Sequence, residues 1–86
     1  MDVNKEVQDI VQSGDKRFSY MMLSRLQSDC NYYLGNGGGH KKHLWAGDEQ
    51  DHIDVMKGIW NSFADNKKPE WLTWEELLDF ERKMVK

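Results

Sequence analysis

The 86-residue sequence has little cysteine and little proline, with one of each, Cys30 and Pro69. A single cysteine cannot form an intramolecular disulfide, which excludes the disulfide-stapled class of small secreted domains and is compatible with a reducing cytoplasm. No apolar run approaches the roughly 20 residues that a membrane-spanning helix requires. The first residues also lack the basic start and apolar stretch of a signal peptide. We therefore expect a cytoplasmic protein that does not associate with a membrane.

An excess of charge of one sign is also lacking. The sequence has 12 Lys and Arg residues against 15 Asp and Glu residues, which gives a formal net charge of -3. A free-standing DNA-binding protein usually carries a basic excess, and this composition has none. Aromatic residues, by contrast, make up 12% of the chain and include four tryptophans. This content is typical of a folded chain, and the length allows one small domain.

Apolar residues recur at three- and four-residue spacings in four segments, which predicts four helices. We expect the first helix over Asp2–Gln12. The second is expected over Tyr20–Leu34, with Ser19 as the N-cap residue whose hydroxyl accepts from a free amide of the first turn. In the third, Asp48 opens the helix and Gly58 lies inside it. A glycine there costs about 1 kcal/mol relative to alanine and favours a close neighbour.

The fourth helix is expected over Trp74–Val85, behind a Thr73–Glu76 capping box. The sequence therefore predicts an all-α fold, a small four-helix domain. An α+β fold is the alternative, in which His43–Trp45 and Glu70–Leu72 pair as a short two-stranded ribbon. We expect residues 1–18 to form an N-terminal helical extension and residues 19–86 to form the helical domain.

The segment Gly35–Gly47 is long for a connection within a small domain, and such loops are usually functional or disordered. Its glycines permit close backbone approach and its lysines can contact phosphate, but it lacks the Gly-Lys-Ser/Thr ending of a phosphate-binding loop. It is a solvated connector, a partner surface or a nucleic-acid contact. The predicted partner-binding residues are Asn36, His40, Lys41, Lys42, His43, Trp45 and Trp71. The nucleic-acid alternative uses Arg25, Lys41 and Lys42.

The tryptophans differ in their predicted environments. Trp60 falls on the inward stripe of the third helix, which indicates a core position. Trp45, Trp71 and Trp74 flank helix starts, where indoles can cover the open end of a core. Because tryptophan is enriched at interface hot spots, an exposed indole at one of these positions would mark a partner site.

Metal-ligating and nucleophilic side chains do not form a convincing site. Of the four zinc-ligand candidates, only His40 and His43 are a closely spaced pair, whereas Cys30 falls on the apolar stripe of a helix and His52 lies apart. A thiol on such a stripe is more typical of a core residue than of a nucleophile. We therefore expect no metal, no cofactor and no catalytic residue, and hence a protein that is not an enzyme.

Three stretches of the sequence, namely MLSRLQSDCNYYLGNG (residues 22–37), KHLWAG (residues 42–47) and KPEWLT (residues 68–73), together resemble the large polyvalent protein-associated domain of the eleventh type. The similarity runs from Tyr20 to Met84. It implies a mobile-element setting, in plasmids, conjugative transposons or phages, and it implies no established activity or catalytic residues. At Gly38 and Gly39 the chain departs from the polar or basic residues expected for the family.

The resemblance and the absence of a credible active site together favour an interaction module of a mobile element, one that counters a host defence such as restriction or CRISPR. The expected partner is an unidentified protein, for example a host defence component, or a second copy of the chain in a homodimer. The alternative is an accessory nucleic-acid-binding protein of conjugation or replication.

Overall fold

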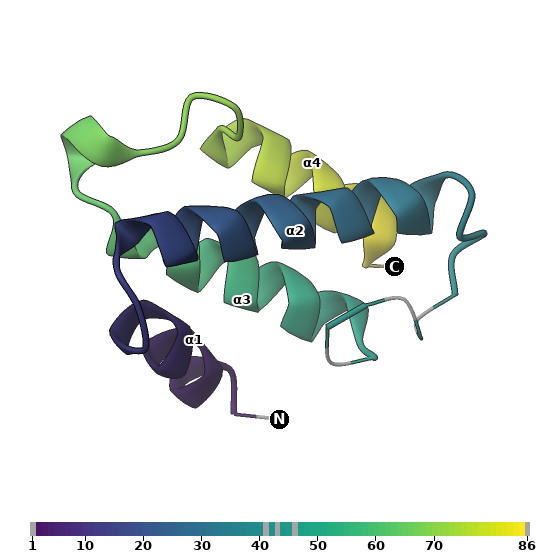
Figure 1. The fold of residues 1–86 in the computed structure, drawn as a ribbon. Coiled ribbons are helices and arrows are strands. Elements are labelled where there is room, and N and C mark those ends of the chain that lie inside the picture. Colours follow the sequence, from purple (N-terminus) through teal and green to yellow (C-terminus); the bar gives the residue numbers. More distant parts are fainter. Residues whose placement is uncertain (1, 41, 43, 46, 86) are drawn as a thin grey trace.

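The computed structural model describes residues 2–40, 42, 44–45 and 47–85. Its elements follow the chain in the order α1 (Val3–Gln12), α2 (Lys16–Leu34), α3 (Glu49–Ser62), the 3-10 turn η2 (Asp65–Lys67) and α4 (Trp74–Met84), as Figure 1 shows. The described residues contain no strand, and the predicted all-α fold is confirmed. None of the helices within these residues is both long and apolar enough to cross a lipid bilayer.

The two-stranded ribbon of the α+β alternative is wrong for the residues that the structure describes. Residues 44–45 and 70–72 lie in bends and turns. Their backbone groups pair with side chains of other elements, because the Trp45 N–H donates to His52 and the Trp71 carbonyl accepts from Gln27. Backbone groups that are satisfied in this way no longer need a partner strand.

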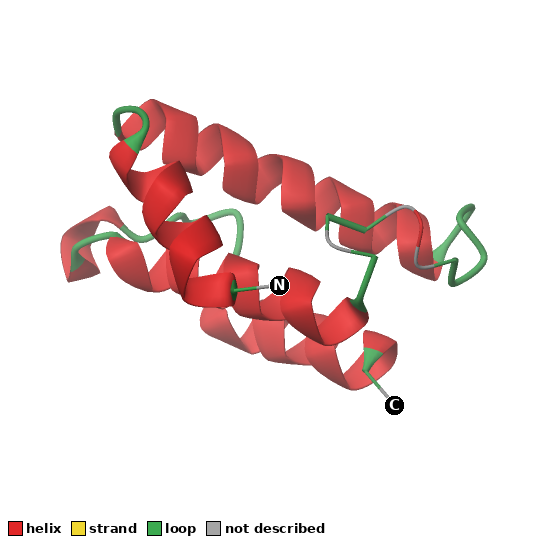
Figure 2. Cartoon of the chain, turned by 90° about the horizontal axis from the view of Figure 1, so that it is seen from below, coloured by secondary structure: helices red, strands yellow, loops and turns green. Residues whose placement is uncertain are grey.

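Both α2 and α3 pack against the other three α-helices, and α3 is the central element because its contacts with them are the more extensive. In Figure 1, α2 crosses in front of α3 and α4. In Figure 2, seen from below, α1 lies across α2 and α3. The bulkiest apolar side chains of the core, all less than 2% exposed, come mainly from α2, α3 and α4, and they are Leu23, Leu26, Ile53, Met56, Ile59, Leu72, Leu77 and Met84.

The start of α2 differs from the prediction by one turn. The N-cap is Asp15, whose carboxylate accepts from the Phe18 N–H at 3.2 Å, and Ser19 is buried inside the helix. The N-cap prediction for Ser19 is therefore wrong. Asp caps as well as Ser, and the earlier start adds a turn that packs Phe18 against the core. The division into residues 1–18 and 19–86 stays a prediction, with residue 18 now in the first turn of α2.

The capping signals of the other two long helices are confirmed. Asp48 is the N-cap of α3 and accepts from the Asp51 N–H at 2.9 Å. At the start of α4, the Thr73 hydroxyl accepts from the Glu76 N–H at 3.1 Å, and the Glu76 carboxylate accepts from the Thr73 N–H at 3.2 Å. Each contact satisfies an amide that the first turn of a helix leaves without a partner.

Candidate interaction surface

The segment between α2 and α3 begins as a tight turn over the end of α2. The Gly37 N–H donates to the Tyr32 carbonyl at 2.6 Å, and the Gly39 N–H donates to the Tyr33 carbonyl at 2.9 Å. Gly38 and Gly39 have φ angles of 62° and 76°, a region that glycine enters without steric cost. The glycine run therefore has a structural reason, which is to turn the chain at the end of the helix.

The other end of this segment is held by a buried histidine. Leu44 inserts into the core, and the Trp45 N–H donates to Nδ1 of His52 at 3.1 Å. Nε2 of the same ring donates to the Leu26 carbonyl at 2.9 Å. Burial lowers the pKa of His52, because the imidazolium would lose its hydration, while the Leu26 hydrogen bond and the charge of Asp29 act in the opposite direction. A neutral ring thus links the loop to α2.

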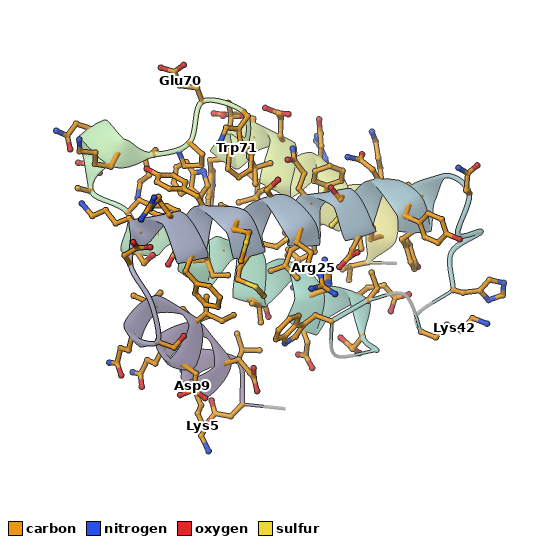
Figure 3. The ribbon with its side chains drawn as sticks, in the orientation of Figure 1. Lys5, Asp9, Arg25, Lys42, Glu70 and Trp71 are labelled. Carbon is orange, nitrogen blue, oxygen red and sulfur yellow. The ribbon has the colours of Figure 1, made fainter. Side chains whose placement is uncertain are left out.

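Five of the seven predicted partner-binding residues are described, and all five are exposed, namely Asn36, His40, Lys42, Trp45 and Trp71. The other two, Lys41 and His43, lie outside the described residues. The structure does not gather the five on one surface. Figure 3 shows Lys42 beyond one end of the bundle and Trp71 over the opposite side of α2. That these residues bind a partner stays a prediction.

Trp71 combines an exposed side chain with a fixed backbone. The residue is 43% exposed. The Trp71 carbonyl accepts from Nε2 of Gln27 at 3.3 Å, and the next carbonyl, that of Leu72, accepts from Nε1 of Trp60 at 2.9 Å. The segment is thereby tied to α2 and to α3. An indole on a backbone held in this way can bury a large area against a partner without a cost for ordering the backbone.

The outward face of α2 carries two exposed apolar side chains that were not predicted as site residues. Met21 is 59% exposed and Tyr32 is 47% exposed. Arg25, predicted for nucleic-acid contact, comes between them in the sequence of the same helix and is exposed. Figure 3 labels its side chain on α2. The sequence spacing could have predicted this face, because residues 21, 25, 28 and 32 form a second stripe on the side of α2 away from its buried residues.

Cys30 and His52 are core residues rather than members of a reactive pair. Cys30 is fully buried, its sulfur lies 3.5 Å from the sulfur of Met56, and burial followed by the charge of Asp29 raises its pKa to about 12. A thiol in this state is not a nucleophile at neutral pH. In the part of the chain that is described, no group of three or more His, Cys, Asp or Glu side chains is placed to hold a metal ion.

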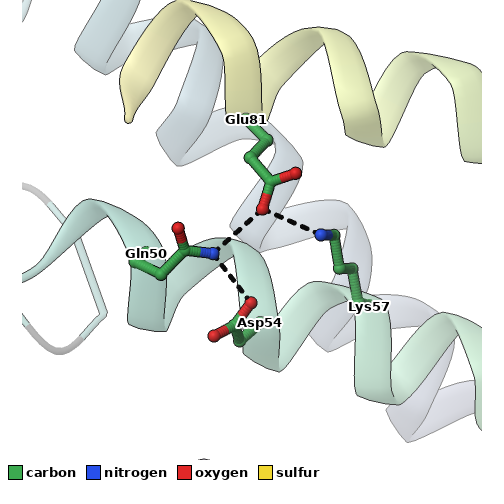
Figure 4. A network of polar contacts seen from close by, with 4 residues as sticks. All are labelled: Gln50, Asp54, Lys57 and Glu81. Atoms are coloured by element: carbon green, nitrogen blue, oxygen red, sulfur yellow. Dashed lines mark hydrogen bonds and ion pairs between the residues drawn. The ribbon is translucent and has the colours of Figure 1, made fainter. Parts of the chain in front are cut away.

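A polar cluster joins α3 to α4. In Figure 4, Oε2 of Glu81 accepts from Nζ of Lys57 at 2.8 Å and from Nε2 of Gln50 at 2.9 Å, and the same amide donates to Asp54 at 2.9 Å. These contacts with Lys57 and then Gln50 lower the pKa of Glu81. Donors from α3 therefore keep the Glu81 carboxylate ionised. This arrangement indicates that Glu81 stabilises the packing of α4 on α3 rather than transferring protons.

A groove of about 530 Å³ lies between the glycine turn, the start of α3 and the end of α4. On its wall, the Tyr33 hydroxyl donates to a Glu49 carboxylate oxygen at 2.7 Å, and this bond is the main cause of the raised pKa of Tyr33. None of the five exposed residues predicted for partner binding lines this groove. Its lining residues are Tyr33, Gly38, Gly39, Asp48, Glu49, Gln50, Met84 and Val85.

Comparison with known proteins gives one match. The family model of the large polyvalent protein-associated domain 11 matches residues 16–84. The matched range begins with the first residue of α2 and ends with the last residue of α4, so that α1 lies outside it. No curated protein and no solved structure matches the chain. Because the match covers most of the sequence, the resemblance is confirmed, and the chain belongs to the family of the large polyvalent protein-associated domain 11.

Proposed function

We propose that this domain is a small non-enzymatic interaction module of a mobile genetic element, acting in the cytoplasm, and that it binds a protein of a host defence system such as restriction or CRISPR. The observation that carries the proposal is Trp71, which is 43% exposed and lies on a backbone that is hydrogen-bonded to Gln27 and Trp60. Such an anchor costs little conformational entropy on binding and supplies much apolar area.

The environments of the reactive side-chain types support a role without catalysis. Cys30 is buried with a raised pKa, and both ring nitrogens of His52 are engaged in hydrogen bonds. One carboxylate oxygen of Glu81 accepts from both Lys57 and Gln50. A nucleophile or a general base needs access to substrate and a pKa near the working pH. Cys30 and His52 are buried, and the pKa of Glu81 is lowered away from neutrality.

Charge favours a protein partner over DNA. The net charge of -3 gives no general attraction to phosphate. Of the residues predicted for phosphate contact, Arg25 and Lys42 are exposed, on the middle of α2 and beyond the end of the bundle (Figure 3), and Lys41 lies outside the described residues. Accessory nucleic-acid binding in conjugation or replication is therefore the alternative, and the experiment must distinguish it from binding to a host protein.

The test is a transformation assay with a matched pair of variants. A plasmid that carries the gene is introduced into a host with an intact defence system and into the same host without it. We expect the wild-type gene to raise transformation of the defended host only, and Trp71→Ala to abolish the gain, since losing a hot-spot indole costs about 2 kcal/mol or roughly 30-fold in Kd.

The control is Leu34→Ala, which removes an exposed apolar side chain of 39% exposure from the end of α2 and should keep the gain. Equal transformation of the defended host with and without the gene, together with no host protein retained by the purified domain, would overturn the proposal. Binding to DNA at low salt that weakens steeply as salt is added would instead support the alternative.

A further inference from the structure

We propose that the outward face of α2 pairs with the same face of a second copy of the chain, in an antiparallel arrangement, to form a homodimer. The face consists of Met21, Arg25, Ser28 and Tyr32. This inference does not depend on the proposed function, because it uses neither Trp71 nor a host protein.

The spacing of the face is that of a helix-pairing seam. Its four positions follow one another at steps of four, three and four residues, the repeat that keeps one stripe of a helix against a partner helix. Met21 and Tyr32 are the most exposed of the large apolar side chains in the described residues, at 59% and 47%. This stripe is not part of the hydrophobic core. The residues of α2 that enter the core, such as Leu26 and Cys30, lie on the other side of the helix.

The apolar part of the face is complementary to itself, as a two-fold interface requires. In an antiparallel pair centred between residues 25 and 28, Met21 of each copy lies opposite Tyr32 of the other. A thioether against an aromatic ring is a favourable contact. The Tyr32 ring also packs closely on the glycine turn, since a methyl group added at Gly37 would lie 2.9 Å from its Cδ1 atom. The ring is thereby oriented before any pairing.

The charges favour the antiparallel direction. In this register Arg25 lies opposite Ser28 and beside Asp29 of the second copy, and the two-fold axis generates the same pair of opposite charges twice. A parallel pair would place Arg25 opposite Arg25, which is unfavourable. The small side chain of Ser28 at the centre lets the two backbones approach, so that the long side chains on either side can meet.

The small size of the seam predicts a weak dimer. A helix of 19 residues is about 28 Å long. A standard interface buries about 800 Å² per partner, which is about 15% of the 5387 Å² surface of this chain. A seam of four side chains along one helix buries less than this, and we therefore expect a Kd in the micromolar range rather than an obligate dimer.

The experiment is sedimentation equilibrium of the full chain between about 1 and 200 µM, a range that brackets a micromolar Kd. The wild-type mass should rise from 10.2 kDa toward twice that value. Met21→Glu and Tyr32→Lys should each weaken association by at least about 30-fold, as loss of a hot-spot residue does. An equimolar mixture of the two variants should associate again, because Glu at position 21 then lies opposite Lys at position 32.

Leu34→Glu is the matched control, since it adds the same charge to an exposed apolar site of α2 outside the seam and should leave association unchanged. Thermal unfolding of each variant checks that the fold is kept, and Met21→Glu, which changes the more exposed of the two residues, should unfold at the wild-type temperature. A wild-type chain that stays at 10.2 kDa throughout, or a mixture that does not associate, would overturn the proposal. Neither result would change the expected binding of a host protein through Trp71. Conversely, failure of the chain to bind a host protein would not contradict the dimer.

Discussion

Val7 of α1 lies against Gly58 of α3 so closely that a methyl group added at position 58 would sit 2.5 Å from Cγ2 of Val7. Carbon atoms in favourable contact are separated by about 3.5–4.0 Å. Glycine inside a helix costs about 1 kcal/mol relative to alanine, and the central helix therefore gives up some intrinsic stability at this position. In return, α1 packs directly against its backbone.

Replacing Gly58 by alanine should destabilise the protein although alanine is the better helix former. Overpacking of a close contact costs about 1–3 kcal/mol, and the stiff β-branched side chain of Val7 cannot turn away easily. A contact of 2.5 Å places this cost in the upper part of the range, about 2–3 kcal/mol. After subtracting the gain in helix propensity of about 1 kcal/mol, we expect Gly58→Ala to lower the free energy of unfolding by about 1–2 kcal/mol. Urea unfolding monitored by circular dichroism measures this change.

The double variant Val7→Ala with Gly58→Ala should recover part of the loss, because the alanine at position 7 leaves room for the new methyl group. The coupling free energy between the two changes is then favourable. Asn61→Ala, at an exposed site of α3, is the control and should stabilise slightly or have no effect. A Gly58→Ala protein as stable as Asn61→Ala would contradict the close packing.

Features that depend on neighbouring residues alone were predictable from the sequence. The Thr73–Glu76 capping box and the Asp48 cap need only a few consecutive residues, and both are present. The glycine within the third helix was also correctly interpreted as a sign of a close neighbour. The sequence could not say that the neighbour is Val7, because that contact depends on how α1 crosses α3.

Features that depend on distant contacts were not predictable. The choice between Asp15 and Ser19 as the cap of α2 is decided by packing of the added turn, since either side chain caps well. The role of His52 requires the Leu26 carbonyl, 26 residues away in the sequence, to lie at its ring. The second stripe of α2 is visible in the spacing, but the sequence alone does not reveal that Met21 and Tyr32 stay exposed when the described residues pack together.

The stability of the protein should fall as the pH is lowered below about 6.5, because of His52. The unfolded chain has an ordinary histidine pKa of about 6.5, whereas burial lowers the pKa in the folded protein. Between these two values the unfolded state binds a proton that the folded state does not, and the free energy of unfolding therefore decreases with falling pH. The contribution is complete above about pH 6.5 and is lost as the pH falls through the folded-state pKa.

Urea titrations at a series of pH values from about 8 to 5 measure this dependence. His52→Gln should be less stable at neutral pH and should lose the slope in this window. The control His40→Gln changes an exposed histidine and should keep the wild-type slope. Constant stability of the wild-type protein across the window, or an imidazole pKa above about 6.5 by NMR, would show that the buried ring does not titrate as described.

Cys30 should be almost inert toward thiol reagents in the folded protein. Its side chain is fully buried, its pKa is raised to about 12, and only the thiolate reacts. At about pH 8, reaction with an aromatic disulfide reagent should be at least about 100-fold slower than in urea, because the folded state must open first. Asn31→Cys adds a thiol at the exposed neighbouring position and should give one fast and one slow equivalent. Rapid labelling of the wild-type protein would place the thiol outside the core.

Removing the charge of Glu81 should weaken the packing of α4 on α3. Glu81→Gln keeps the shape of the side chain but loses the ion pair with Lys57. In this pair the Lys57 side chain is 24% exposed and the Glu81 side chain is 26% exposed. Partial exposure limits the loss to about 1 kcal/mol near neutral pH. The pKa of Glu81 is lowered in the folded protein, and its contribution is therefore present above the unfolded-state value of about 4.3 and is lost as the pH falls through the folded-state pKa. The difference between wild type and variant should accordingly shrink in acid.

Thermal unfolding at neutral and at acidic pH tests both parts of this expectation. The matched control is Asp79→Asn, which removes a charge from the same helix at the exposed pair with Arg82, where the side chains are 49% and 75% exposed. Solvent screens that pair, and the variant should unfold close to the wild-type temperature at both pH values. If Asp79→Asn and Glu81→Gln lowered the unfolding temperature equally, the half-buried cluster would have no special part in joining the two helices.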